Sequence, residues 1–453
     1  MNGETSSEIT PVFGQRALQH FSFQPGYRSF GATPRKLQER ARYYQTQFEE
    51  RPDPWLRYEA PKLLDENRAA AAGLLNAPVE TVVLVSNATV GTNTVFRNLT
   101  WDDDGRDEIL HFSTAYGACA KTIDYVVDSS GGKVTSREIV LSYPCEDEEV
   151  LDAFRNAVSQ SQTEGKRARV CVFDTVSSLP GVRFPFESMT KACKDLGITS
   201  FIDGAQGIGQ IPIDLTAVDP DFFVTNCHKW LHVPRSCAVL YVPVRNQHLI
   251  SSTLPTSHGY VPKIGTRFNP LPPPAAGNSA FVHNFQFVGT LDTSAYMCIK
   301  DAIEWRKEVF GGEEEIMKYI QWLAAEGGRR AAEILGTTIM ENKSGGLTKC
   351  ALVNIALPMW VRPAPGATNA PEAFTPQPED IVISLEESLG VDRWMRKIFM
   401  EEYNTFMPLY IHRHRVWFRL SAQVYLDVHD FEWAAKTMLE VIKRVAKREY
   451  ETK

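Results

Sequence analysis

The segments FIDGAQ (201–206) and TNCHKW (225–230) decide how this chain folds and what it can bind. Each contains or follows a short run of β-branched and aromatic residues that is typical of a buried strand, so Asp203 and Lys229 lie where strands end. Ligands of a mostly parallel α/β sheet bind at the carboxyl ends of its strands. A carboxylate there can pair with a protonated ring nitrogen, and a partly desolvated lysine has a lowered pKa that favours imine formation.

Outward from these segments, short apolar runs alternate with helical stretches. Buried strands are predicted at Val82–Ser86, Val170–Phe173, Ser200–Ile202, Phe222–Thr225 and Val239–Val242. Between two of them, Glu187–Leu196 has apolar positions at helical spacing. This alternation predicts an α/β domain with a mostly parallel sheet covered by helices on both faces.

The C-terminal part of the chain predicts a smaller α+β domain. Its helical segments are Ala302–Ile334 and Phe431–Arg448, and its strands are Leu352–Leu357 and Val416–Leu420. Two Pro-rich stretches, Asn269–Ala276 and Arg362–Pro378, predict exposed loops. We therefore expect an N-terminal segment (1–60) packed on the small domain, a large ligand-binding domain (61–295) and a small C-terminal domain (296–453).

The composition excludes several classes of protein. The 453 residues include 43% hydrophobic and 23% charged residues, and the net charge of -7 argues against nucleic acid as a partner. The N-terminus lacks the features of a signal or transit peptide, and no apolar run reaches the roughly 18 residues that a membrane span needs. The eight cysteines have no metal-ligand spacing, so we expect a reduced, cytoplasmic protein without a metal site.

The order and spacing of DGAQ and NCHK resemble the class V aminotransferases, which are pyridoxal 5′-phosphate (PLP) enzymes of fold type I. The resemblance is to the group that contains isopenicillin-N epimerase-like proteins, ergothioneine-type C–S lyases and the fungal loline-alkaloid PLP enzyme. It implies a seven-stranded sheet, with Lys229 as the Schiff-base lysine and Asp203 as the partner of the pyridine nitrogen. It further implies that Gln206 reaches the phenolic oxygen, and that Asn226 and His228 touch the phosphate.

Taken singly, an aspartate after a strand is more often a helix N-cap, and a lysine is usually a solvated surface charge. The two motifs together at this spacing favour the cofactor. The turn that contains Ala88 and Thr89 follows a strand and opens a helix, whose N-terminus can bind phosphate, although the same residues could serve only as caps. By resemblance, Ala88 and Thr89 form the phosphate site.

Three further cofactor residues and one substrate residue come from the same resemblance. Tyr116 matches the position of a ring that stacks on the pyridine, with a core tyrosine as the alternative, and Ser178 is expected to face the cofactor. Thr290, after Gly289, matches a residue that reaches the phosphate of the other subunit, which implies a homodimer with shared active sites; an N-cap is the alternative. Arg419 matches the arginine that binds the substrate α-carboxylate, a task for which a guanidinium fork is suited.

The chain departs from this family in three places. Tyr27–Gly31 lacks the Asn-His-Gly of its relatives, and Leu231–Ser236 has bulkier residues where the family has glycines. The chain also lacks an evident mobile catalytic cysteine, because Cys350 abuts a predicted strand and is expected in the core. Cys119, Cys145 and Tyr116 stay open as general acids, although both cysteines are better explained as small buried residues.

These features predict a PLP-dependent enzyme that acts at Cα, or at Cα and Cβ, of an α-amino acid through an external aldimine. The altered entrance segment and the long Pro-rich insertion favour a specialised substrate of fungal secondary metabolism, such as alkaloid biosynthesis. C–S lysis of the ergothioneine type, transamination, epimerisation and decarboxylative ring formation are alternatives, and a non-catalytic PLP-fold protein is a further one. A Rossmann oxidoreductase is excluded because no GxGxxG follows the first strand.

Overall fold

The computed structural model describes residues 11–22, 30–273, 278–364 and 374–451. Parts of three segments discussed above lie outside the described residues: Tyr27–Ser29 of the altered entrance segment, and sections of both Pro-rich stretches.

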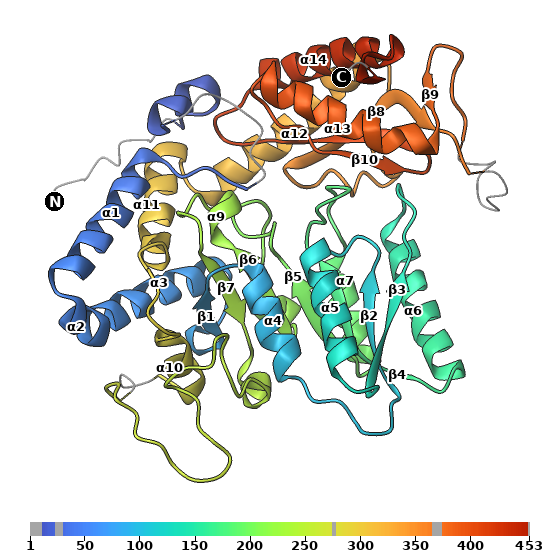
Figure 1. Cartoon of the computed structure of the whole chain (residues 1–453). Coiled ribbons are helices and arrows are strands. Elements are labelled where there is room, and N and C mark those ends of the chain that lie inside the picture. Colours follow the sequence, from blue (N-terminus) through green and yellow to red (C-terminus); the bar gives the residue numbers. More distant parts are fainter. Residues whose placement is uncertain (1–10, 23–29, 274–277, 365–373, 452–453) are drawn as a thin grey trace, which may run out of the picture.

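The large domain is built on a seven-stranded sheet with the order β1-β7-β6-β5-β4-β2-β3 (Figure 1). Its strands are β1 (Val82–Val85), β2 (Asp107–Phe112), β3 (Val134–Ile139), β4 (Arg167–Asp174), β5 (Thr199–Asp203), β6 (Phe222–Asn226) and β7 (Ala238–Tyr241). β7 pairs antiparallel with both neighbours, and the pairs among β2 to β6 are parallel. The prediction of a mostly parallel sheet is therefore confirmed.

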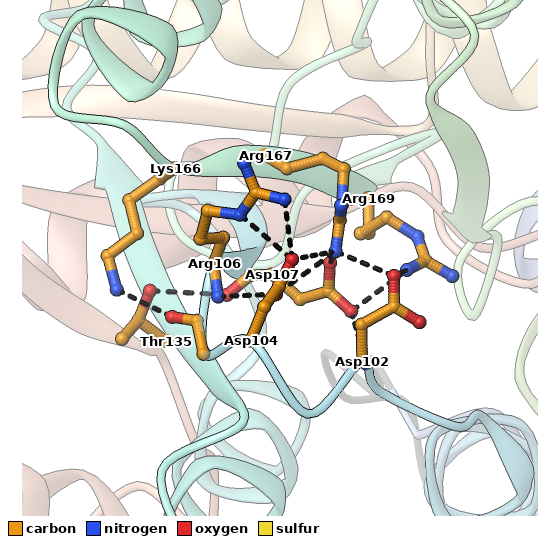
Figure 2. Close-up of polar contacts among 9 residues, drawn as sticks. Asp102, Asp104, Arg106, Asp107, Thr135, Lys166, Arg167 and Arg169 are labelled. Carbon is orange, nitrogen blue, oxygen red and sulfur yellow. Dashed lines mark hydrogen bonds and ion pairs between the residues drawn. The ribbon is translucent and has the colours of Figure 1, made fainter.

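β2 and β3 were not predicted because neither has the continuous apolar run of a buried strand: β2 begins with buried acidic residues, and β3 has half-buried and exposed polar residues between two buried ends. β2 begins with Asp107, which is fully buried. Its carboxylate lies 2.6 Å from Arg167 and 2.9 Å from Arg169 at the start of β4 (Figure 2). These ion pairs join the first residues of two neighbouring strands, at the edge of the sheet opposite to the strand ends that carry Asp203 and Lys229.

Helices cover both faces of this sheet (Figure 1). They are α4 (Ala88–Asn98), α5 (Gly117–Ser129), α6 (Asp147–Thr163), α7 (Phe186–Asp195), α8 (Leu215–Val218), α9 (Cys227–Trp230) and α10 (Ala280–Gln286), with 3₁₀ turns η3 (Val79–Thr81) and η4 (Val244–Leu249). The predicted helix Glu187–Leu196 corresponds to α7. Two buried clusters of apolar side chains, one on each face, form the core.

The small domain consists of a four-stranded sheet with helices packed against it. The strands are β8 (Leu352–Val361), β9 (Ile381–Ile383), β10 (Leu409–His412) and β11 (Arg415–Ser421), in the order β10-β11-β8-β9. The helices are α12 (Glu313–Leu335), α13 (Leu385–Glu401) and α14 (Val428–Ala446), with the 3₁₀ turn η6 (Glu449–Glu451). Before them, the 3₁₀ turn η5 (Tyr296–Cys298) and α11 (Ile299–Phe310) pack on the helix Ala60–Leu74.

The prediction of one helix over Ala302–Ile334 was wrong, because the chain breaks between α11 and α12. Gly311 and Gly312 separate the two helices and have φ values of +85° and +107°. Residues with a side chain rarely adopt such angles, so this pair of glycines ends the first helix and lets the second begin in a new direction.

The N-terminal segment contains the 3₁₀ helix η1 (Gly14–His20), α1 (Arg35–Glu50), α2 (Pro52–Pro54) and the π-helix η2 (Trp55–Glu59), and α3 (Ala60–Leu74) follows. Phe13 stacks on Tyr319 with ring centroids 4.3 Å apart, and the Gly14 N–H donates to the carbonyl of Val424 at 2.9 Å. Both partners belong to the C-terminal part of the chain, and the division at residues 60 and 295 stays a prediction.

The small domain lies over the end of the large sheet where α9 is found (Figure 1). At this junction the side chain of Asn354 in β8 accepts from the Gly181 N–H at 2.9 Å and donates to its carbonyl at 2.8 Å. Two reciprocal hydrogen bonds to one peptide fix the distance between the domains. Among the described residues, no helix is long and apolar enough for a membrane span.

Candidate active site

Lys229 lies in the short helix α9, which directly follows β6. Burial of its ammonium group lowers the pKa of Lys229 to about 8, although the negative charge of Asp203 acts against the shift. Its Nζ is 5.9 Å from the centre of the Tyr116 ring, which is partly exposed at the start of α5. Roughly a tenth of the amines are therefore uncharged at pH 7 and able to attack a carbonyl.

Asp203, the last residue of β5, has both carboxylate oxygens occupied. Oδ1 accepts from the Ala205 N–H at 2.9 Å, and Oδ2 accepts from the Cys119 thiol at 3.1 Å. Burial and the charge of Asp203 raise the pKa of Cys119 well above its usual value, so its sulfur keeps the proton that it donates. Cys119, considered earlier as a general acid or a small buried residue, thus contacts the carboxylate assigned to the cofactor.

Asp174 is a second buried carboxyl group at the same edge of the sheet. It ends β4 and is the register partner of Asp203, the residue that ends β5. Its Oδ2 has no hydrogen-bond partner among the described residues. Burial, and then the negative charge of Asp203, raise the pKa of Asp174 well above its ordinary value. Asp174 was assigned no role from the sequence, although it ends a buried strand just as Asp203 does.

The predicted phosphate turn forms the N-terminus of α4. Asn87 caps this helix by accepting from the Val90 N–H at 2.9 Å, and the Asn226 side chain accepts from the Ala88 N–H at 2.9 Å. The N–H and hydroxyl of Thr89 have no hydrogen-bond partner among the described residues. They stay available to an anion, and Asn226 contacts the turn by holding the backbone of Ala88.

His228 is held as a neutral imidazole beside Lys229. Its Nδ1 is 2.9 Å from the carbonyl oxygen of Cys237 and 3.4 Å from the nitrogen of the same residue. We assign the proton to Nδ1 because the shorter contact is to a carbonyl, which only accepts. Burial lowers the pKa of His228 to about 4. Nε2 is then an acceptor, so a hydrogen bond from His228 to a phosphate requires the phosphate or the ring to gain a proton.

Gln206, in the turn after β5, and Trp230, the last residue of α9, contact each other. The indole Nε1–H of Trp230 donates to Oε1 of Gln206 at 2.8 Å, and both side chains are buried. The sequence analysis assigned Gln206 to the cofactor but gave Trp230 no role. Its position directly after Lys229 indicates that it lies near the site, but its contact with Gln206, 24 residues away in the sequence, has no local signal.

Arg419 lies in β11, buried at 3% exposure, where it faces the large domain. Its Nη1 donates to the carbonyl of Ser178 and is 3.4 Å from the Ser178 hydroxyl. Nε has no hydrogen-bond partner, and no carboxylate pairs with the guanidinium, within the part of the chain that the structure describes. Burial lowers the pKa of Arg419 to about 10. A buried cation without a counter-ion favours an anionic ligand.

Two predicted site residues differ from the others in their surroundings. Ser178 holds Arg419, as its hydrogen bonds indicate. Thr290 is exposed, next to Gly289, whose N–H donates to Ser257 Oγ at 3.2 Å. The structure shows no contact between Thr290 and the other predicted site residues.

The burial of its cysteines distinguishes this protein from enzymes that use a catalytic cysteine on a mobile loop. All eight cysteines lie in the described residues, and each is buried and unpaired. Cys350 is fully buried, as expected, and burial raises the pKa of Cys145 to about 12. Among the described residues, no group of three or more His, Cys, Asp or Glu side chains could hold a metal ion.

Gly31 joins the N-terminal segment to the lysine. It has φ +76°, and a Cβ at this position would overlap the carbonyl oxygen of His228. The Gly31 carbonyl accepts from Arg235 at 3.3 Å. The part of the altered entrance segment that the structure describes therefore lies directly on the backbone of the lysine-bearing helix.

The donor set fits PLP on chemical grounds. A buried lysine with a lowered pKa suits the aldehyde, a carboxylate suits the pyridine nitrogen, and free donors at the N-terminus of α4 suit the phosphate. The fold and the site together define a PLP-dependent enzyme of fold type I. The aminotransferase class-V family model matches residues 35–356, and the chain belongs to this family.

Two curated relatives span nearly the whole chain. The L-cysteine desulfhydrase-like protein lolT1 of Epichloe uncinata is 35% identical over 452 residues, covering 96% of this chain and 97% of its own. Hercynylcysteine sulfoxide lyase of Schizosaccharomyces pombe is 31% identical over 433 residues, with 94% and 97% covered. The resemblance inferred from DGAQ and NCHK is thereby confirmed.

Solved structures support the fold. The cystine C-S lyase C-DES, in complex with its product cysteine persulfide, has a TM-score of 0.66 and 17% identity, covering 92% of this chain and 97% of its own. The apo cysteine desulfurase of Thermococcus onnurineus NA1 has a TM-score of 0.68 and 14% identity, with 96% and 99% covered. At these identities the likeness concerns the fold alone.

Proposed function

We propose that the chain is a PLP-dependent lyase that acts at Cα and Cβ of an α-amino acid and cleaves a carbon–sulfur bond of a cysteine-derived substrate. The observation that carries this proposal is the buried guanidinium of Arg419, which has no carboxylate partner among the described residues and contributes to the lowered pKa of Lys229. A substrate carboxylate would supply the missing negative charge.

The residues of this chain divide the work as follows. Lys229 holds the cofactor and then moves the Cα proton, for which its pKa of about 8 leaves it reactive near neutral pH. Asp203 would pair with the pyridine nitrogen, Tyr116 would stack on the ring, and Ala88, Thr89, Asn226 and His228 would hold the phosphate. When bound, PLP supplies the electron sink that weakens the bonds at Cα. The small domain covers the site and excludes water.

Carbon–sulfur cleavage is preferred for two reasons. The two relatives described above are a cysteine desulfhydrase-like protein and a sulfoxide lyase. Release of the sulfur as a leaving group needs no protein thiolate, whereas a desulfurase transfers the sulfur to an accessible cysteine, and all eight cysteines here are buried. Cleavage without a protein nucleophile therefore agrees better with this chain.

The finer parts of the proposal concern substrate and assembly. Leu231–Ser236 replaces the glycines of the family directly after the lysine, which supports a specialised amino acid of fungal secondary metabolism, including alkaloid pathways. Exposed Thr290 supports a homodimer in which each subunit completes the other's phosphate site. Eight unpaired cysteines support a reducing, cytoplasmic location.

The test is to load the purified protein with PLP and add L-cysteine, an S-alkyl cysteine and a cysteine S-oxide in turn. Release of ammonia and a keto acid, together with the sulfur product, supports the lyase, and the fastest substrate gives the class. Conversion of the bound cofactor to its amine form without sulfur release would indicate transamination instead. No visible cofactor band in wild type, or an unchanged band in Lys229→Ala, would overturn the catalytic proposal in favour of a non-catalytic PLP-fold protein.

A further inference from the structure

A chain of buried contacts runs from α11 to Gln206. Trp230 is 1% exposed and directly follows Lys229. Its side chain contacts Gln206, and its backbone carbonyl accepts from Nη1 of Arg306 at 2.6 Å. Arg306 lies in α11, so this helix is connected through a single tryptophan to a residue assigned to the cofactor.

The contact with Trp230 determines which way the Gln206 amide is turned. An amide has an acceptor oxygen on one side and a donor NH₂ group on the other, and the two are similar in shape. An indole N–H can only donate, so the atom 2.8 Å from it must be the amide oxygen. The NH₂ group of Gln206 is therefore left free to donate elsewhere.

Trp230 in turn has little freedom to move. Gly209, at φ +78°, lies so close that a Cβ would come within 2.9 Å of the Trp230 carbonyl group. Gly209 belongs to the same turn as Gln206, and its carbonyl accepts from Nη2 of Arg306 at 3.1 Å. One guanidinium thus binds the backbone on both sides of the contact between Trp230 and Gln206.

Arg306 is itself fully buried and well satisfied. It donates to Glu313 from Nε at 2.5 Å and from Nη2 at 2.6 Å, and Nη1 also lies 2.8 Å from Nδ1 of His232. His232 has φ +64°, within the segment where this chain lacks the glycines of its family. A bidentate pair with a carboxylate leaves the remaining guanidinium donors oriented toward the two loops.

We propose that Trp230 is a positioning residue that orients Gln206 so that its NH₂ group donates to the phenolic oxygen of the cofactor, with Arg306 holding Trp230 in place. This inference rests on the proposed assignment of Gln206. Without the indole donor, the amide can turn over and present its oxygen to an electron-rich phenolic oxygen, which is unfavourable. If Trp230 only fills the core, its size matters and its N–H does not.

The first experiment compares Trp230→Phe with Trp360→Phe as a matched control. Each substitution removes one buried indole N–H, and Trp360 donates at 2.7 Å to Asp380, away from the site. The readout is the pH midpoint of the visible absorbance of bound PLP. Loss of a donor to the phenolic oxygen destabilises its anionic form, so Trp230→Phe should raise the midpoint by about 1 pH unit. Trp360→Phe should leave it unchanged.

A second comparison separates positioning from packing. In a Gln206→Leu background, which has no amide, Trp230→Phe should produce no further shift of the midpoint. Asp203, Asp174, Cys119 and Arg419, the charged and titratable groups that influence Lys229, are retained in every variant. An unchanged midpoint in Trp230→Phe, or an equal shift in both backgrounds, would overturn the proposal. Complete absence of the visible band in wild type would instead contradict the proposed function.

A measurement on the wild-type apoprotein covers the case in which Trp230→Phe does not fold. The indole proton of Trp230 should be protected from exchange with solvent, and Gln206→Leu should make it exchange at least tenfold faster, since its acceptor is lost. The indole proton of Trp360 should be unaffected by the same substitution. Equal exchange rates of the Trp230 proton in wild type and Gln206→Leu would show that the hydrogen bond does not form.

Discussion

Asp174 and Asp203 end two neighbouring parallel strands in register, and only Asp203 has both oxygens hydrogen-bonded. Two buried carboxyl groups this close do not both ionise readily. The better-solvated member of such a pair carries the charge. Asp203 accepts two hydrogen bonds, whereas burial and then the negative charge of Asp203 raise the pKa of Asp174, so Asp174 holds its proton.

This assignment predicts how stability depends on pH. The raised pKa of Asp174 means that folding favours its protonated form. The contribution of Asp174 to the free energy of unfolding is therefore complete below the ordinary carboxyl pKa near 4, and it is lost as the pH rises toward the raised pKa. Asp174→Asn cannot lose a proton. The free energy of unfolding of this variant, minus that of wild type, should grow by about 1.4 kcal/mol per pH unit across that window. Urea titration of the apoprotein at several pH values measures it.

Removal of the neighbouring charge is the control for this effect. Asp203→Asn lowers the pKa of Asp174, because the charge of Asp203 is the second cause of its elevation. The pH range over which the stabilities of Asp174→Asn and its parent diverge should therefore be narrower when both carry Asp203→Asn. A difference curve for Asp174→Asn that is flat with pH would mean that Asp174 is already ionised in the folded protein.

The lowered pKa of Lys229 predicts the rate at which the apoprotein takes up PLP. Only the neutral amine attacks, so the loading rate should rise about tenfold per pH unit below 8 and level off above it. Asp203→Asn should move this midpoint to lower pH, because the carboxylate stabilises the ammonium form. Stopped-flow absorbance records the rate. A midpoint near 10.4, the ordinary lysine value, would contradict the burial of the amine.

Substitution of Arg419 by lysine tests the carboxylate site. Arg419→Lys keeps the charge but loses the fork, so kcat/KM should fall about 10- to 100-fold, mainly through KM. The cofactor band should persist, since Arg419 is assigned to the substrate. Exposed Arg413, which directly follows β10 and lies outside the site, provides the control, and Arg413→Lys should behave like wild type. A loss confined to kcat would point to a role in the chemical step.

The ion pairs at the far edge of the sheet predict a difference between two neighbouring aspartates. Asp107 is fully buried and binds both Arg167 and Arg169 (Figure 2), whereas the Asp103 side chain is 88% exposed in its pair with Lys133. Asp107→Asn should cost about 2 kcal/mol, less than a fully buried pair because both arginines reach solvent. Asp103→Asn should change stability by less than about 0.5 kcal/mol. Equal losses in urea unfolding would refute this difference.

A hybrid of two inactive variants tests the shared active site. Thr290→Ala should weaken PLP binding about 10- to 100-fold through loss of a hydrogen bond to the phosphate, and Lys229→Ala should abolish activity. If Thr290 serves the other subunit, a dimer of the two variants contains one site with both changes and one intact site. Unfolding and refolding the mixture should then restore activity. No recovery would mean that Thr290 acts within its own subunit or not at all.

Much of the fold could be predicted because its buried strands are apolar and its breaks are marked by glycine and proline. β2 and β3 were not predicted because charged residues interrupt their apolar pattern. Asp107, for example, is buried in β2 by an ion pair that the local sequence does not reveal. In the site, Asp203 and Lys229 were predictable because each follows a strand directly. Trp230 and Arg306 were not, because their roles depend on contacts between residues 24 and 76 positions apart, which no local pattern contains.

Gly31 has a practical consequence for anyone who shortens this protein. The match to the family begins at residue 35, yet Gly31 lies before it and covers the backbone of the helix that carries Lys229. A truncated version begun at the family boundary would retain every residue assigned to PLP and still expose that helix to solvent. A shortened protein for crystallisation or engineering should therefore begin before Gly31, although the family match begins only at residue 35.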